Sequence, residues 1–210
     1  LAEIRTDAAR DAGAALGFAA GLAALLGASR ARPLLWIAPA LALGEAGYPY
    51  LPGLAEFGLD GDALVVVRTR RLEEAVWAAE EAARSGAAAL TLLEAPGNPA
   101  ILGLEGTRRL HLRASASGRP LLLLRLGARP ETTAAPLRLH LAAGPAGAVE
   151  GVADPRLLGA ASLRLVAEKT RGPTGRSVHL EWDRHDQRFR LPASGPLPGR
   201  VPAQARDRPD

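Results

Sequence analysis

The chain of 210 residues contains no cysteine and no methionine, and its only lysine is Lys169. Without cysteine, disulfides, thiolate metal sites and a cysteine nucleophile are all excluded, which fits a reducing cytoplasm. Because the initiator methionine is missing, we expect that Leu1 is not the natural start and that an N-terminal portion has been cut away. The sequence also contains no GxSxG motif, the usual setting of a serine nucleophile.

A long apolar run of the membrane-spanning kind is also lacking. Residues 12–29 carry no charge, but they are mostly alanine and glycine with only five large apolar side chains. A membrane span or a signal peptide needs more large apolar residues and different flanks. We therefore expect a helix packed inside a cytoplasmic protein.

Strong charge asymmetry is absent from most of the chain. The net charge is +4, and the whole excess falls in residues 151–210, because residues 1–150 contain equal numbers of acids and arginines. A basic end of this size permits direct DNA binding but does not require it.

Residues 63–95 predict the fold class. Leu64 to Val67 form an apolar run typical of a strand covered on both faces, and residues 88–93 repeat it. Between them, apolar residues recur at helical spacing, acids and arginines occupy the opposite side, and Gly86 ends the helix. A parallel pair of strands needs a crossover of this length, so the stretch predicts one parallel βαβ unit and an α/β fold.

The remaining pattern predicts one domain over residues 1–191 and a Pro-rich flexible tail over residues 192–210. We expect further strands at 1–5, 33–39, 120–126 and 137–142, helices at 12–29 and 102–117, and a long loop at 40–62 with a helical piece at 54–59. Residues 144–159 are expected to be exposed. Residues 162–170 and 177–184 predict an antiparallel hairpin around 172–175.

This order of elements is that of a RecA-type core, and scattered positions along it resemble the ImuA family. They lie in the runs LAEIR (1–5), GFA (17–19), LLW (34–36), PGL (52–54), FGL (57–59) and EWD (181–183), in Arg70, Arg71, Trp77, Glu80 and Glu81 of the crossover helix, and in RRL (108–110). The resemblance implies a mostly parallel twisted sheet flanked by helices, with the antiparallel hairpin at its end.

The resemblance also implies a role in SOS-induced translesion synthesis. Proteins like ImuA work with ImuB, an inactive Y-family polymerase homologue, and with an error-prone DNA polymerase, and RecA is an associate of the family. We therefore expect a non-catalytic adaptor without a cofactor. Two alternatives are a RecA-family protein that binds nucleotide or DNA, and a SulA-like cell-division inhibitor.

A phosphate-binding loop needs a glycine-rich turn, a lysine and a Ser/Thr hydroxyl. In its place, residues 6–17 offer Thr6, Arg10, Gly13 and Gly17 as a degenerate version without the Lys-Ser/Thr pair. Residues 38–39, Ala-Pro, stand where a RecA-type ATPase carries its water-activating carboxylate. Glu94 stands where a magnesium-coordinating acid would lie, or is an ordinary strand-end glutamate on the surface. We predict that ATPase activity has been lost.

Candidate partner-binding residues lie on three segments. Trp77 falls on the polar side of its helix, so it is either an anchor for a partner or covered by the 40–62 loop. Arg108, Arg109 and Arg113 form a basic helix side, which is either solvated or contacts phosphate or an acidic partner. Lys169, Arg171 and Arg176 cluster near the hairpin turn. His179, Glu181 and Asp183 share a strand face, which alternation explains better than a metal site.

Overall fold

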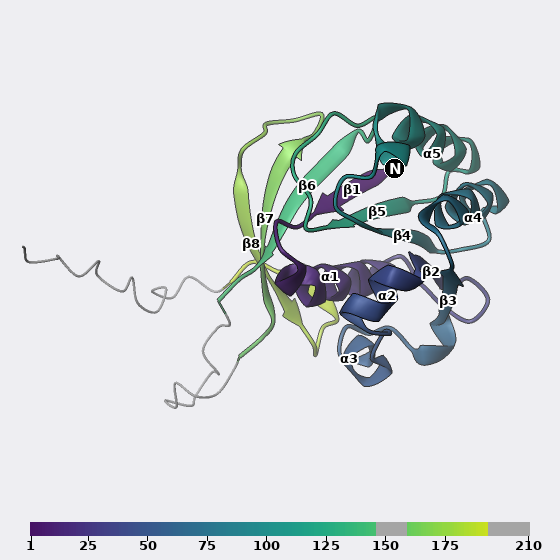
Figure 1. The fold of residues 1–210 in the computed structure, drawn as a ribbon. Coiled ribbons are helices and arrows are strands. Elements are labelled where there is room, and N and C mark those ends of the chain that lie inside the picture. The colour runs from purple at the N-terminus through teal and green to yellow at the C-terminus, as the bar shows by residue number, and fades with distance from the viewer. Residues whose placement is uncertain (146–158, 193–210) are drawn as a thin grey trace, which may run out of the picture.

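A nine-stranded sheet forms the centre of the molecule, with the strand order β3-β2-β4-β5-β1-β6-β7-β8-β9 (Figure 1). The computed structural model describes residues 1–145 and 159–192. All pairings from β3 to β6 are parallel, and β7, β8 and β9 are added by antiparallel pairings. The predicted α/β class, with a mostly parallel sheet and an antiparallel hairpin at the C-terminal side, is confirmed. The strands are β1 (Ala2–Arg5), β2 (Leu34–Pro39), β3 (Leu64–Thr69), β4 (Leu90–Pro96), β5 (Leu121–Leu126), β6 (Leu137–Ala143), β7 (Ser162–Lys169), β8 (Ser177–Asp183) and β9 (Arg188–Arg190).

Helices cover both faces of the parallel part of the sheet (Figure 1). α1 (Ala12–Leu25), α2 (Ala40–Ala46) and α3 (Leu51–Ala55) contribute to the core on one face, together with Ile4, Leu122 and Leu124 of the sheet. α4 (Leu72–Ser85) and α5 (Leu104–Ser117) pack on the other face. Short 3-10 helices η1 (Ala9–Asp11), η2 (Gly61–Ala63) and η3 (Ala100–Leu102) precede α1, β3 and α5.

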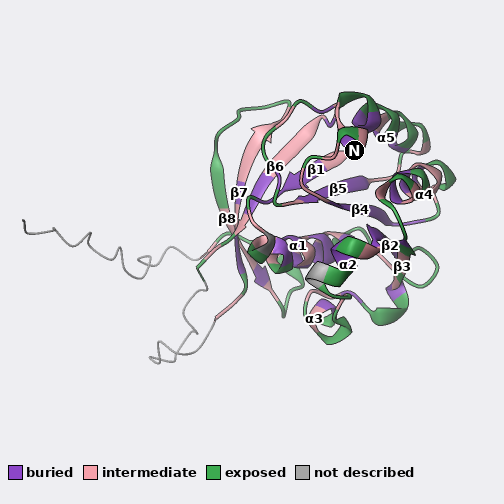
Figure 2. Ribbon diagram, in the orientation of Figure 1, coloured by how far each residue is buried: buried purple, intermediate pink, exposed green. Residues whose placement is uncertain are grey.

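Side-chain alternation along the central strands supplies the two cores. Leu122 and Leu124 of β5 face α1, whereas Leu121 and Leu123 face α4 and α5, as successive strand residues must. The central strands are accordingly buried on both sides (Figure 2). α1 is rich in alanine and glycine, so its backbone can approach the sheet closely.

An aromatic cluster joins the antiparallel strands to α1 and α3. Trp182 of β8 is buried, and its ring centroid lies 4.8 Å from that of Phe189 and 5.6 Å from that of Phe57. Phe189 in turn packs on Phe18 of α1 at 5.0 Å. The indole nitrogen of Trp182 donates to the carbonyl of Glu56 at 2.8 Å. Trp182 is thus buried on the side of β8 opposite His179, Glu181 and Asp183, whereas Val178 on the same side as Trp182 is exposed.

Two of the helices end at a glycine. α4 ends at Gly86 and α5 at Gly118, and both glycines have a φ of 67°. This left-handed conformation carries no steric cost without a Cβ. The predicted crossover helix before Gly86 and the predicted helix at 102–117 are thus confirmed to within a turn, and the latter begins at Leu104, after η3 and Gly103.

Three predictions about the fold are corrected. β3 and β4 are parallel but do not pair with each other, because β2 lies between them. β3 is an edge strand with Val65 exposed, so the prediction that it is covered on both faces is wrong. The 40–62 segment holds the helices α2 and α3 rather than a long loop, and the helical piece falls at Leu51–Ala55 instead of 54–59.

Residues 146–158 of the predicted exposed segment lie outside the described residues, as does the predicted tail apart from Pro192. Over the described parts of the chain, no helix combines the length and the apolar character needed to cross a membrane.

Candidate functional site

The turn after β1 stands where a RecA-type ATPase would hold its phosphates. It is short, because only Thr6, Asp7 and Ala8 separate β1 from η1. Asp7 pairs with the buried Arg5 and lies 3.0 Å from the Nε2 atom of His140. The hydrogen bond from Arg5, followed by the charges of His140 and Arg5, lowers the pKa of the Asp7 carboxyl, so this acid is ionised at neutral pH. Asp7 therefore occupies the buried cation of this turn, Arg5, in place of a phosphate.

Thr6 carries the only hydroxyl in this turn, and it is used for structure. Thr6 is fully buried, its hydroxyl donates to the carbonyl of Ala8 at 3.1 Å, and it accepts from the backbone N–H of Gly127 at 3.2 Å. Its backbone is also held between β1 and β5, because its N–H donates to the carbonyl of Arg125 at 2.9 Å. The hydroxyl therefore fixes the turn to β5 and is not free to coordinate an ion.

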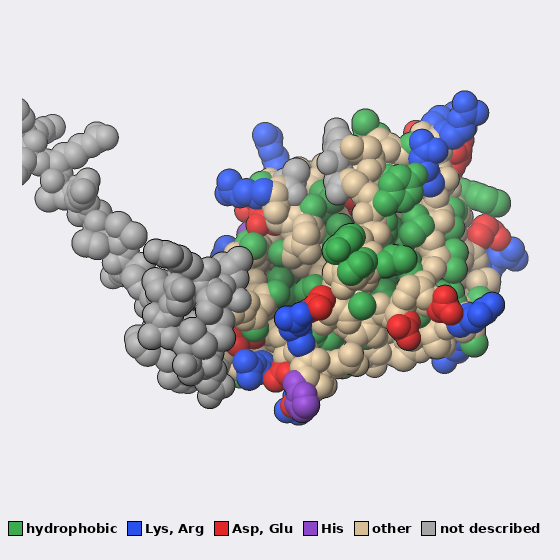
Figure 3. Space-filling view, turned by 90° about the horizontal axis from the view of Figure 1, so that it is seen from below, with side chains coloured by type: hydrophobic (Ala, Val, Ile, Leu, Met, Phe, Trp, Pro, Cys, Tyr) green, Lys and Arg blue, Asp and Glu red, His purple; other side chains and the backbone are tan. Residues whose placement is uncertain are grey.

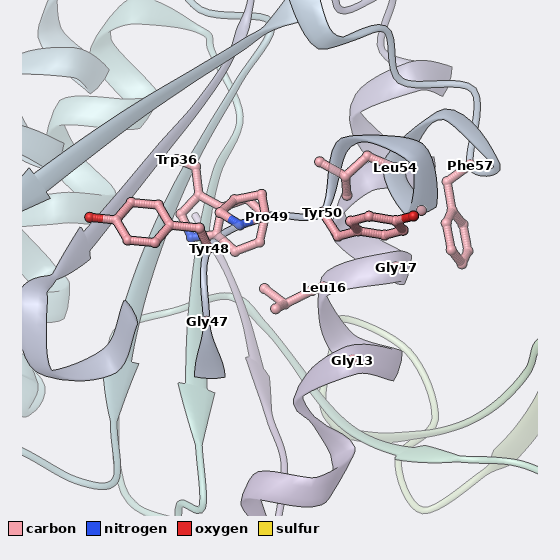
Figure 4. Close-up of a pocket in the computed structure, with 11 residues that line it drawn as sticks. Gly13, Leu16, Gly17, Trp36, Gly47, Tyr48, Pro49, Tyr50, Leu54 and Phe57 are labelled. Carbon is pink, nitrogen blue, oxygen red and sulfur yellow. The ribbon is translucent and has the colours of Figure 1, made fainter. Parts of the chain in front are cut away.

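The two glycines of the degenerate loop, Gly13 and Gly17, line an apolar pocket. Hydrophobic side chains gather in the middle of the face formed by α1 and the α2–α3 segment (Figure 3). The pocket lies between α1 and residues 47–57, with a volume of about 280 Å³, and Trp36 of β2 and Phe57 also line it (Figure 4). Arg10 is exposed and does not line this pocket. Gly13 and Gly17 are thus brought together, but in an apolar setting and apart from Thr6 and Arg10.

Glu94 lies at the end of β4 and is buried, with 1% of its surface exposed. The interpretation as a surface glutamate is therefore wrong. Its Oε2 atom accepts a hydrogen bond from the indole nitrogen of Trp36 at 2.8 Å, whereas its Oε1 atom is buried without a partner. Burial raises the pKa of the Glu94 carboxyl, and the Trp36 hydrogen bond offsets only part of that rise.

A buried ionic network lies on the α5 side of β1, β5, β6 and β7. Arg125 is fully buried, and its guanidinium lies 3.3 Å from the buried Glu3 and 2.8 Å from Glu131. Glu168 of β7 joins Arg5 to Arg138, with a hydrogen bond of 2.8 Å from the Nε of Arg5 and an ion pair of 3.0 Å to the Nε of Arg138.

This network was missed by the sequence interpretation. Its signal is present nonetheless, since Glu3 and Arg5 are two residues apart on one strand and Arg125 interrupts an otherwise apolar run. The register brings these positions together, because Arg5 lies opposite Arg125 on one side and His140 on the other. Three arginines are matched by four acids, so the network pairs its own charges and offers no unpaired arginine to a phosphate. Its members are Glu3, Arg5, Asp7, Arg125, Glu131, Arg138 and Glu168, with His140 beside Asp7.

Trp77 is 66% exposed on the outer side of α4. The alternative that the 40–62 segment covers it is wrong, because α2 and α3 pack on the opposite face of the sheet. Glu80, one turn further along α4, forms an ion pair of 3.1 Å with Arg109 of α5. Trp77 and Arg109 therefore belong to one surface that spans α4 and α5, which we call the Trp77 surface.

The other basic candidates do not form one site. Arg108 and Arg113 are exposed on α5. Arg171 and Arg176 are exposed at the hairpin turn, but Lys169 points away from them and donates to the carbonyl of Thr133 at 2.9 Å. In the described residues, no group of three or more His, Asp or Glu side chains is placed to hold a metal ion.

No family model matches this chain, and no curated protein sequence matches it. Among solved structures, the chain is similar to the crystal structure of SulA from Pseudomonas aeruginosa, with 21% identity and a TM-score of 0.43. The similarity covers 60% of this chain and 96% of the SulA chain. A likeness this distant says nothing about what the chain binds or does.

Proposed function

We propose that this chain is a non-catalytic adaptor with a RecA-like core in the SOS-induced translesion synthesis mutasome. Its partner would be an ImuB-like, inactive Y-family polymerase homologue, with RecA and an error-prone DNA polymerase as further associates. The proposal joins the resemblance of scattered residues to the ImuA family with the geometry of the turn after β1. The order of strands and helices, ending in antiparallel strands, supports the RecA-like assignment.

The observation that carries the non-catalytic part is the state of the turn after β1. In open α/β sheets, ligands bind outside the carboxyl ends of the strands, near the point where the strand order reverses. At the carboxyl end of β1, the Thr6 hydroxyl is engaged with Gly127, Asp7 adds negative charge, and no lysine is present. Phosphate binding requires backbone N–H groups, a cation and a free hydroxyl at this point.

The Trp77 surface supports the binding part of the proposal. Tryptophan and arginine dominate the energetics of protein interfaces, and here the exposed Trp77 lies on α4, whose Glu80 is paired with Arg109 of α5. Direct DNA binding has less support, because the basic side chains are dispersed and several are paired with acids.

Co-purification tests the proposal. The native chain and a variant of it truncated after Leu191 are each co-expressed with an ImuB-like subunit and recovered from clarified extract. The proposal predicts that the two proteins co-purify in a defined ratio and that the complex shows no ATP turnover. Absence of any complex, with the fold of the chain intact by circular dichroism, would overturn the adaptor function and favour nucleotide or DNA binding.

A further inference from the structure

The pocket between α1 and residues 47–57 has the size and lining of a site for a single large side chain. Its volume is about 280 Å³, at the lower end of the roughly 300–1,000 Å³ usual for small-molecule sites. Leu16 points into it and Trp36 forms part of its wall (Figure 4). Among the described residues that line it, none is a lysine, arginine, aspartate or glutamate. Such a lining favours an apolar or aromatic group over a nucleotide or another charged ligand.

Exposed aromatic and aliphatic side chains surround this pocket. Tyr48 is 63% exposed and Tyr50 is 73% exposed, and both contribute to the pocket. Leu51 follows directly and is also exposed, as is Leu41 on α2. Figure 3 shows hydrophobic side chains concentrated on this face, with charged ones around them. A grouping of this kind on a soluble protein marks a binding surface.

The segment that forms one wall of the pocket is acidic, although one of its acids, Glu56, is paired with Arg184. Residues 33–67 contain four acids and no lysine or arginine, although the whole chain has a net charge of +4. Asp60 and Asp62 are exposed on either side of Gly61, whose Cβ position is 3.5 Å from the Leu51 side chain. Asp62 has only a weak partner, because Arg30 is 3.9 Å away and both side chains are exposed. This rim therefore attracts positive charge.

We propose that this pocket is a docking site for a segment of another protein, in which one large apolar side chain is flanked by arginine or lysine. The apolar side chain fills the pocket between Gly13, Gly17 and Trp36, and the basic residues face Asp60 and Asp62. Electrostatic complementarity of this kind selects partners and speeds their association. A second copy of the chain is a poorer occupant, since a symmetric contact would bring two acidic rims together. An anionic membrane surface is repelled for the same reason.

The docking site is separate from the Trp77 surface. α1 and residues 47–57 lie on one face of the sheet, and α4 lies on the other. Both surfaces can therefore be occupied at the same time. The docking site goes beyond the proposed function, because binding at the pocket and binding at the Trp77 surface do not depend on each other.

Gly13 allows a sharp test. A Cβ added at Gly13 meets no atom within 4 Å, and Gly13 lines the pocket, so Gly13→Leu extends a side chain from the pocket wall with no clash at its Cβ. Gly44 of α2 is the matched control, because a Cβ there is equally free and Gly44 does not line the pocket. Both variants exchange a helical glycine for leucine, which improves helix propensity by roughly 1 kcal/mol. Circular dichroism and urea unfolding of both variants then separate a loss of binding by Gly13→Leu from a folding defect.

The probe is a short fluorescein-labelled peptide made of arginine, leucine and one central phenylalanine, followed by fluorescence anisotropy with the full chain. We expect saturable binding that Gly13→Leu weakens at least about tenfold and that Gly44→Leu and Trp77→Ala leave unchanged. Replacing the peptide's phenylalanine with alanine, or its arginines with glutamates, should weaken binding comparably.

Several results would overturn this proposal. They are no binding by the native chain, equal binding by Gly13→Leu, or equal binding of the glutamate peptide. Self-association of the native chain that is abolished by Gly13→Leu would assign the pocket to a second copy instead. Because Trp77→Ala acts only on the other face, failure of this site and failure of the ImuB-like interaction are distinguishable.

Discussion

The indole nitrogen of Trp36 donates a 2.8 Å hydrogen bond to Glu94, and both side chains are buried under α1. One carboxylate oxygen of Glu94 is satisfied by this bond, and the other has no partner. A buried carboxylate with one unsatisfied oxygen is costly when ionised, which is why burial raises the pKa of Glu94.

Glu94 should make the chain less stable as the pH rises. The folded chain holds the Glu94 proton more firmly than the unfolded chain, so stability falls as the pH increases above the ordinary carboxyl value of 4.5. Glu94→Gln keeps an oxygen acceptor for Trp36 and removes the ionisation. We expect Glu94→Gln to be more stable than the native chain at pH 8, with a difference that shrinks toward pH 4. Urea unfolding of both proteins across this range measures it.

Glu105→Gln is the control for this experiment, because Glu105 is exposed on α5. The two changes are the same in chemistry, so a pH-dependent difference in stability confined to Glu94→Gln is due to the burial of Glu94. An unchanged or lower stability of Glu94→Gln at pH 8 would show that the Glu94 carboxylate is not penalised by burial.

Two helical glycines should respond oppositely to alanine. A Cβ at Gly106 would lie 1.8 Å from the backbone carbonyl oxygen of Ile101, so the backbone must move. We expect Gly106→Ala to lower the free energy of unfolding by about 2 kcal/mol or more. A Cβ at Gly13 meets nothing within 4 Å, so Gly13→Ala should raise the free energy of unfolding by about 0.5–1 kcal/mol. Thermal and urea unfolding of the pair measures both, and equal effects would contradict the packing described around α5.

Arg125 and Glu3 should be energetically coupled. Both are buried, so Arg125→Met leaves Glu3 with uncompensated charge, and we expect a loss of about 3–5 kcal/mol. Adding Glu3→Gln removes that charge. The double variant should therefore be more stable than the sum of the two single changes predicts, by at least about 1 kcal/mol. If the two single changes in the free energy of unfolding add up strictly to that of the double variant, Arg125 and Glu3 are not energetically coupled.

Much of the fold could be predicted because its signals are local. The apolar runs of β2 and β5, the amphipathic spacing of α4 and the glycines at the ends of α4 and α5 all act within a few residues. The pairing of strands is not local. A run such as Leu64 to Val67 indicates a strand, but whether it lies at the edge or beside β4 depends on how α2 and α3 pack before it.

The candidate site was harder to predict for the same reason. The absence of a lysine and a free hydroxyl in residues 6–17 is visible in the sequence, and the structure adds that Thr6 is engaged with Gly127. The pocket could not be foreseen, because it arises where α1 meets residues 47–57, and α2 and α3 are too short to show a clear apolar period. The burial of Arg125 likewise depends on strands that are distant in the chain.

ATP turnover should be absent from the purified chain. The turn after β1 lacks a lysine and a free hydroxyl, and Asp7 places a negative charge there. We expect no release of phosphate above the buffer blank when the chain is incubated with ATP and Mg²⁺, with or without single-stranded DNA. Turnover that co-elutes with the chain through a final sizing column would contradict the non-catalytic assignment.

The most direct test of the adaptor proposal is the affinity of the purified ImuB-like subunit for the native chain and for Trp77→Ala. Trp77 is mostly exposed, so the variant should unfold within about 0.5 kcal/mol of the native chain. We expect its Kd to rise at least about tenfold, while Leu25→Ala, which removes an exposed apolar side chain at the end of α1, leaves the Kd unchanged. Equal affinity of the native chain and Trp77→Ala, or no measurable binding of the native chain, would contradict the account.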